Sequence, residues 1–102
     1  MLGLEIKEFI EALHKRQKMG CILVPEKDLP TLQRAMKEEG IYFGGVPSPK
    51  SSRAFLIRKK EDLISAKAPG VLILSEELYS KDPELAEKVR EKAAYFMNVR
   101  GP

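Results

Sequence analysis

The chain has 102 residues, 43% of them hydrophobic and 32% charged, which suits one globular domain with one modest core. Eighteen lysines and arginines against fifteen aspartates and glutamates give a net charge of +3, weaker than the clustered excess of a dedicated nucleic-acid binder. Cys21 is the only cysteine, which excludes an internal disulfide and any CxxC zinc or redox motif, and fits a reducing compartment. We therefore predict a single domain over residues 1–102.

Two features of the sequence bear on where the protein works. An acidic residue, Glu5, stands where a signal peptide needs cations, and no apolar run approaches the ~18 residues that would span a membrane. Asn98 is the only asparagine, and Gln17 and Gln33 are the only glutamines, among abundant lysine and glutamate, a bias of proteins from hot environments. These features predict a cytoplasmic protein with no membrane partner and a thermophilic source.

The first half of the chain is predicted to hold a helix, a strand and a second helix. A helix over residues 4–19 is indicated by four apolar residues at i, i+3, i+4 and i+7: Ile6, Phe9, Ile10 and Leu13. The apolar run at residues 21–24, closed by Pro25, is typical of a strand buried on both faces. Asp28 is a candidate N-cap for a second helix that ends at Gly40. His14 is expected on the solvated flank of the first helix.

The second half is predicted to hold three strands and two helices. Residues 41–43 and 53–58 favour two strands joined as a hairpin, and residues 61–68 favour a short helix. The wholly apolar run at residues 71–74 predicts an interior strand. Asp82 as N-cap, with proline next, begins a last helix. Its apolar positions at helical spacing are Leu85, Val89, Ala93, Phe96 and Met97.

The element order predicts an α+β fold. The middle six elements match the βαββαβ order of a ferredoxin-like fold, a four-stranded antiparallel sheet with two helices on one face, here with extra N- and C-terminal helices. The terminal helices either cover the open face of the sheet or mediate homodimerisation through four apolar residues: Phe9, Ile10, Phe96 and Met97. A three-layer α/β/α sandwich with a mixed sheet is the alternative.

The loop between the two hairpin strands is the candidate site. Its glycines permit close backbone approach, its prolines stiffen the segment, and its serines and cations suit phosphate, sulfate or carboxylate. The predicted ligand-binding residues are Gly44, Gly45, Ser48, Lys50, Ser51, Ser52 and Arg53. The loop is not a P-loop, because GxxxxGK[ST] is absent and a strand follows it rather than a helix. The sequence thus predicts an anion cradle, or a loop whose prolines and serines only set its shape.

Residues 20–63 resemble the selenium/sulfur carrier-like family of small bacterial domains. The matching stretches are Val24-Pro25, Lys37-Glu38-Glu39-Gly40-Ile41 and Val46-Pro47-Ser48-Pro49-Lys50-Ser51-Ser52. In that family the serines lead into a Cys-Gly pair that would bear the chalcogen, whereas this chain has Arg53-Ala54 there. The resemblance implies the fold, a ligand-facing loop over residues 47–53 and, as one alternative function, a degenerate carrier without its thiol.

Three classes of function remain open. The first is a non-catalytic binding or regulatory module that holds an anionic small molecule or protein partner at residues 47–53. The second is nucleic-acid binding through the basic strand and its aromatic residue, by Arg53, Phe55, Arg58, Lys59 and Lys60. The third is an enzyme, for which no catalytic residue is identified. No cofactor or metal ligand set is indicated, because the chain has one histidine and one cysteine, and Cys21 is predicted to be a buried, inert thiol.

Overall fold

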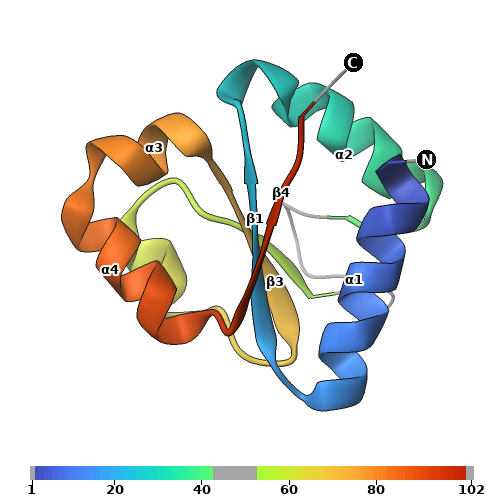
Figure 1. Ribbon diagram of the computed structural model, residues 1–102, viewed down its shortest axis with the longest axis horizontal. Coiled ribbons are helices and arrows are strands. Elements are labelled where there is room, and N and C mark those ends of the chain that lie inside the picture. The colour runs from blue at the N-terminus through green and yellow to red at the C-terminus, as the bar shows by residue number, and fades with distance from the viewer. Residues whose placement is uncertain (1, 43–52, 101–102) are drawn as a thin grey trace.

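A four-stranded sheet with helices on both faces organises the molecule (Figure 1). The computed structural model describes residues 2–42 and 53–100. The elements in chain order are α1 (Leu2–Arg16), β1 (Met19–Val24), the 3-10 turn η1 (Glu26–Asp28), α2 (Leu29–Glu38), β2 (Ala54–Leu56), the 3-10 turn η2 (Lys60–Leu63), β3 (Gly70–Ser75), α3 (Glu76–Lys81), α4 (Pro83–Lys92) and β4 (Tyr95–Asn98).

All the strand pairings of this sheet are parallel, and the strand order is β2-β3-β1-β4. The predicted ferredoxin-like antiparallel sheet is therefore wrong. Residues 41–43 were expected to form a strand of a hairpin. Instead, the Ile41 N–H donates to the carbonyl oxygen of Met36 at 2.9 Å, which closes the end of α2 and tucks Ile41 into the core. The alternative sandwich expected helices on both faces, as observed, but a mixed rather than a parallel sheet.

Two apolar cores lie on the two faces of the sheet. Helices α1 and α2 cover one face, and α3, α4 and η2 cover the other (Figure 1). Because successive side chains of a strand point to opposite faces, Ile22 and Ile73 enter the first core, whereas Cys21 and Leu72 enter the second. Strands β1 and β3 supply both cores at once, which explains why their sequences are continuous apolar runs.

The last helix is shorter than its apolar spacing predicts. Helix α4 ends at Lys92, and Ala93 takes an extended conformation, with φ −96° and ψ 129°. The Ala94 N–H then donates to the carbonyl oxygen of Met19 at 2.8 Å, so the chain joins the sheet beside β1. Phe96 and Met97 therefore lie in a strand, and their predicted place on a helix is wrong.

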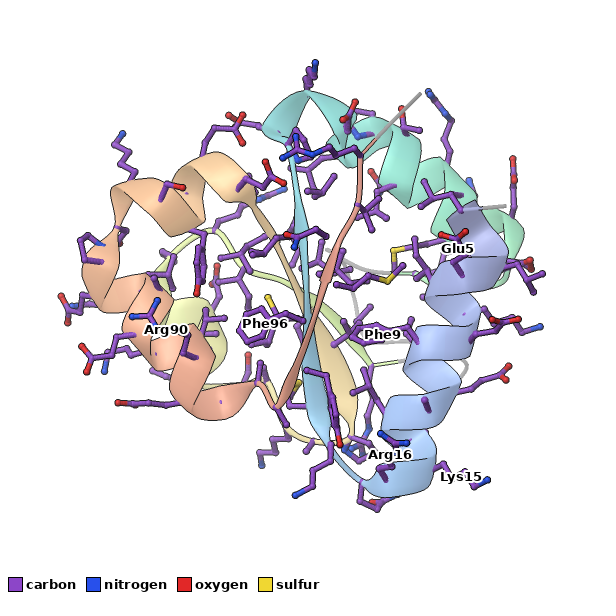
Figure 2. The ribbon with its side chains drawn as sticks, in the orientation of Figure 1. Glu5, Phe9, Lys15, Arg16, Arg90 and Phe96 are labelled. Atoms are coloured by element: carbon purple, nitrogen blue, oxygen red, sulfur yellow. The ribbon has the colours of Figure 1, made fainter. Side chains whose placement is uncertain are left out.

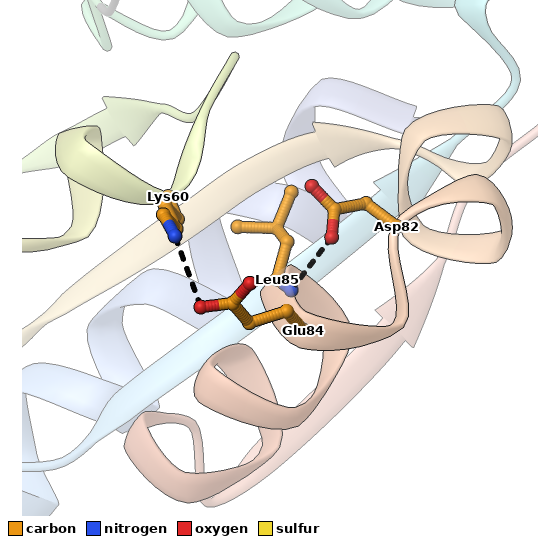
Figure 3. Close-up of polar contacts among 4 residues, drawn as sticks. All are labelled: Lys60, Asp82, Glu84 and Leu85. Carbon is orange, nitrogen blue, oxygen red and sulfur yellow. Dashed lines mark hydrogen bonds and ion pairs between the residues drawn. The ribbon is translucent and has the colours of Figure 1, made fainter.

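Side-chain caps begin the two helices that follow β3. The Ser75 Oγ accepts the Leu78 N–H of α3 at 3.0 Å, and the Asp82 Oδ1 accepts the Leu85 N–H of α4 at 3.1 Å (Figure 3). The N-cap predicted at Asp82 is confirmed. Helix α3 was not predicted, and the helix expected over residues 61–68 is only the single turn η2.

Candidate functional site

The loop predicted to hold an anion lies almost wholly outside the described residues. This applies to Gly44, Gly45, Ser48, Lys50, Ser51 and Ser52, so their role stays a prediction. Arg53 is described and lies exposed at the amino end of β2, where its Nη1 donates to the carbonyl oxygen of Ala68 at 3.4 Å. Its φ of 37° turns the backbone sharply into the strand. Arg53 thus lies at the amino edge of the sheet.

The residues predicted to bind nucleic acid are split between the two ends of β2. Arg53 precedes the strand, whereas Arg58, Lys59 and Lys60 follow it. Phe55 is half-buried and packs against the second core. Because helices cover both faces of the sheet, this fold does not offer the open aromatic sheet surface on which RNA-recognition domains stack bases. Nucleic-acid binding by the exposed cations stays a prediction.

The carboxyl edge of the sheet contains the junction at which parallel α/β folds bind ligands. Strand β1 leads to α2 on one face, and its neighbour β3 leads to α3 on the opposite face (Figure 1). The two segments that follow these strands diverge there and leave a crevice outside the strand ends. This crevice is the usual place for a ligand in open parallel sheets. Pro25 and Glu26 follow β1 at this edge, and Ser75 ends β3.

A hollow of about 240 Å³ lies at this junction. Leu56 and Leu78 supply apolar walls, and Glu26, Arg58 and Ser75 supply polar groups from three different segments. Ser75 is almost fully buried, and because its oxygen accepts the α3 cap bond, its hydroxyl hydrogen is left to donate. The hollow therefore combines one cation, one carboxylate and one buried hydroxyl.

A second hollow, of about 540 Å³, runs along β2 and shares Arg58 with the first. Lys59, Asp62 and Ser65 line its polar side, and Phe55 lines its apolar side. Arg58 thus stands between two openings, one outside the strand ends and one beside the edge strand.

Asp62 fixes the backbone that presents these cations. Its Oδ2 accepts the N–H groups of Arg58, at 2.9 Å, and Lys59, at 3.2 Å. These hydrogen bonds, that of Arg58 above all, hold the pKa of the Asp62 carboxyl below its usual range. Asp62 bonds to backbone groups of this turn, and its charge also attracts those of Arg58 and Lys59. Within residues 2–42 and 53–100, the Arg58 guanidinium forms no ion pair within 4.0 Å and no hydrogen bond. The Arg58 guanidinium is therefore available to an anion.

Lys60 lies apart from this pair. Its Nζ donates to the Glu84 Oε1 of α4 at 3.0 Å, and this contact raises the Lys60 pKa (Figure 3). A third hollow, of about 520 Å³, lies here between η2 and α4 and also includes Lys88 and Glu91. Acidic and basic side chains are equally frequent around this hollow. We therefore expect it to attract an anion less strongly than the hollows lined by Arg58.

Neither Cys21 nor His14 lies in these hollows. Cys21 is completely buried in the second core. His14, expected to be solvated, is half-buried on α1, and its Nε2 has no hydrogen-bond partner among the described atoms. In the described part of the chain, no group of three or more His, Cys, Asp or Glu side chains could hold a metal ion.

Burial makes the Cys21 thiol inert, which gives a direct test. Loss of solvation raises the pKa of Cys21 from 9.0 to about 12. We expect a thiol reagent to label Cys21 slowly in native buffer and quickly after unfolding in urea. Labelling of the native protein as fast as free cysteine would contradict a buried thiol and reopen a redox role.

The same pKa shift predicts a pH dependence of stability. Because the folded pKa is raised, the stabilisation is complete below pH 9.0 and is lost as the pH rises toward 12. A Cys21→Ala variant should lack this dependence. Above pH 9, the free energy of unfolding of the wild type should therefore fall more steeply than that of the variant, and the two slopes should differ by up to about 1.4 kcal/mol per pH unit. Urea titrations of both proteins at several pH values above 9 measure this difference.

Comparisons with protein-family models, curated proteins and solved structures find no match to this chain. The resemblance to the selenium/sulfur carrier-like family therefore stays a prediction. No helix in the described ranges has the length and apolar character needed to cross a membrane.

Proposed function

We propose that the protein is a small binding module that holds an anionic ligand at the carboxyl edge of its sheet, with Arg58 as the anchor. A cytoplasmic location, inferred from the single cysteine, belongs to the same proposal. The sequence favours the same ligand class but places it at the loop over residues 47–53. The geometry of the described residues supports the carboxyl edge better.

The observation that carries the proposal is the unpaired charge of Arg58 beside the β1–β3 junction. Arg58 lines the hollow at that junction and also the one along β2. The Asp62 carboxylate bonds to the Arg58 backbone, and within the described ranges the guanidinium forms no ion pair within 4.0 Å. A guanidinium binds carboxylate or phosphate through two parallel N–H donors, and Lys59 adds a second positive charge nearby. The Ser75 hydroxyl can donate to the same ligand.

The lining also narrows the chemistry of the ligand. Glu26 faces the same hollow as Arg58, and its carboxylate would repel a ligand that presents only negative charge. The ligand should therefore combine an anionic group for Arg58 with a hydroxyl or amino group that donates to Glu26. The hollow is small, at about 240 Å³, which favours a small hydroxylated phosphate or carboxylate.

The test is a titration of the ¹⁵N-labelled protein with inorganic phosphate and with glycerol 3-phosphate, followed by NMR. We expect the amide signals of Glu26, Arg58, Lys59 and Ser75 to shift, and glycerol 3-phosphate to bind more tightly because its hydroxyls reach Glu26. Arg58→Ala should weaken binding at least tenfold, since a charge-assisted contact contributes about 1.5–3 kcal/mol.

Two control variants identify the site. Arg34→Ala removes the same charge from the exposed side of α2 and should leave binding unchanged. Lys50→Ala combined with Arg53→Ala should also leave it unchanged. Loss of binding in that double variant, with Arg58→Ala unaffected, would move the site to the loop. Binding of single-stranded RNA with a steep salt dependence would instead favour the nucleic-acid alternative.

A further inference from the structure

The outer edge of β4 is a sheet edge with little protection from other chains. Among the residues that the structure describes, β4 pairs with β1 alone, so its other side presents backbone groups with no strand partner. Its residues, Tyr95–Asn98, include no charge and no proline. Natural edge strands are commonly protected from other chains by charged side chains, prolines, bulges or very short length.

The opposite edge of the sheet has this protection. Strand β2 is only three residues long, and arginines stand immediately before it, at Arg53, and two residues after it, at Arg58. Two lysines follow. Strand β4 is also short, at four residues, and Arg100 follows it at the same spacing, so the two edges differ in the arginine before β2 and the lysines after it. Of the two edges, β4 is therefore the less protected and the better suited to accept a further strand.

The side chains around β4 are of the kinds enriched in protein interfaces. Tyr95 is 38% exposed and Phe96 is 41% exposed. The Arg16 guanidinium lies 5.5 Å from the centre of the Tyr95 ring on the α1 side. On the other side, Phe96 meets the edge of the Tyr79 ring, and Arg90 donates to the Tyr79 hydroxyl at 3.1 Å. Figure 2 shows Phe96 beside β4, with Arg16 and Arg90 on the flanking helices. Tyrosine, phenylalanine and arginine are the residues that dominate such contacts.

We propose that a second copy of this chain occupies the edge, with β4 paired antiparallel to β4 of the partner. A two-fold axis perpendicular to the sheet would join the two sheets into one of eight strands. Such an interface is isologous, so each copy covers the β4 edge of the other and neither β4 edge remains open to a third chain. The protected β2 edges become the two ends of the joined sheet.

The hydrogen bonds of β4 determine which backbone groups a partner meets. The Val99 N–H donates to the carbonyl oxygen of Leu23 on β1, at 2.9 Å. The register with β1 is constant from Tyr95 to Asn98, and backbone groups alternate in direction within that stretch, so those of Met97 also face β1 and those of Phe96 and Asn98 face outward. The Ala94 N–H faces β1 as well, so the alternation is interrupted just before Tyr95. In the antiparallel pair, Phe96 of each copy therefore exchanges both backbone bonds with Asn98 of the other, and Met97 faces its own symmetry mate.

The cation that follows β4 does not oppose this pairing. Arg100 lies two residues beyond the strand, and its guanidinium is already paired with Glu76, at 3.2 Å.

Sedimentation velocity and light scattering, from micromolar to millimolar protein, test the proposal. We expect a dimer whose fraction rises with concentration. Asn98 is exposed, so Asn98→Lys should leave the monomer folded while adding charge beside Phe96 of the partner, and should weaken the dimer at least tenfold. The control Ile64→Lys adds the same charge at a 78% exposed site next to η2, and this variant should dimerise as the wild type does.

Engineered disulfides test the register. Met97 residues facing each other would form a non-hydrogen-bonded antiparallel pair with Cα atoms about 4.5 Å apart, within the range that a disulfide spans. Under mild oxidation, Met97→Cys should form a covalent dimer, and Tyr95→Cys should not. A wild-type protein that stays monomeric throughout, or a dimer unaffected by Asn98→Lys and not cross-linked through residue 97, would overturn the proposal.

Discussion

Replacing Ile73 by alanine is expected to lower the free energy of unfolding by about 2–5 kcal/mol. Ile73 is completely buried at the middle of β3, between β2 and β1, and belongs to the first core. Removing three carbons there leaves a cavity under α1 and α2 that rigid neighbouring strands cannot fill. Equilibrium urea denaturation followed by circular dichroism measures the change.

The same substitution at an exposed isoleucine provides the control. Ile64 is 78% exposed in the turn after η2, so Ile64→Ala should change the free energy of unfolding by less than about 0.5 kcal/mol. A loss below about 1 kcal/mol for Ile73→Ala would contradict the central position of β3, because even a buried isoleucine-to-valine change often costs that much.

Gly70→Val is expected to cost about 1–3 kcal/mol and to loosen the edge strand β2. A Cβ atom at Gly70 would lie 2.7 Å from the Arg53 carbonyl oxygen and 2.9 Å from the Phe55 ring. The same carbonyl accepts the Val71 N–H at 3.1 Å, so the strands must separate for a side chain to fit. Hydrogen exchange should therefore show faster exchange at the Val71 amide than in the wild type.

Gly40 offers a contrasting glycine. Its φ is +75°, and nothing lies within 4 Å of an added Cβ, so Gly40→Ala should cost only the backbone strain of about 1 kcal/mol. That variant should leave the exchange rate of the Val71 amide unchanged. Equal acceleration at Val71 in both variants would show that general destabilisation, rather than a local clash, is responsible.

The interior strands could be predicted because burial on both faces requires apolar residues at every position. The runs at residues 21–24 and 71–74 have this property, and they are the centres of β1 and β3. The helix N-cap at Asp82 could be predicted for a similar reason, because its side chain bonds to a backbone N–H only three residues further along the sequence. Such features depend on neighbours in the sequence.

The direction of the strands could not be predicted in the same way. Whether a strand runs parallel to its neighbour depends on where the connection crosses, and the sequence of β2 does not fix that direction; its pairing with β3 is parallel. The spacing of Val89, Ala93, Phe96 and Met97 also fits a continuing helix. Only the pairing of residues 95–98 with β1 makes that stretch a strand.

The proposed site at the carboxyl edge was not predicted as such, for the same reason. Arg58 and Lys59 were recognised from their charge, but Glu26 and Ser75 were not connected with them. Glu26 follows one strand and Ser75 ends another, and these ends meet only if the strands are parallel. With an antiparallel sheet in mind, the sequence gives no reason to place their side chains in one hollow.

The position of β1 has a consequence for the order in which the chain can fold during synthesis. This strand leaves the ribosome early, yet Gly20 pairs with Val71 on one side and with Tyr95 on the other. An emerging chain therefore carries its most apolar strand with both edges open until β3 and β4 have been made. Long-range pairing of this kind slows folding and exposes the growing chain to aggregation, so we expect that nascent chains ending before β4 recruit chaperones.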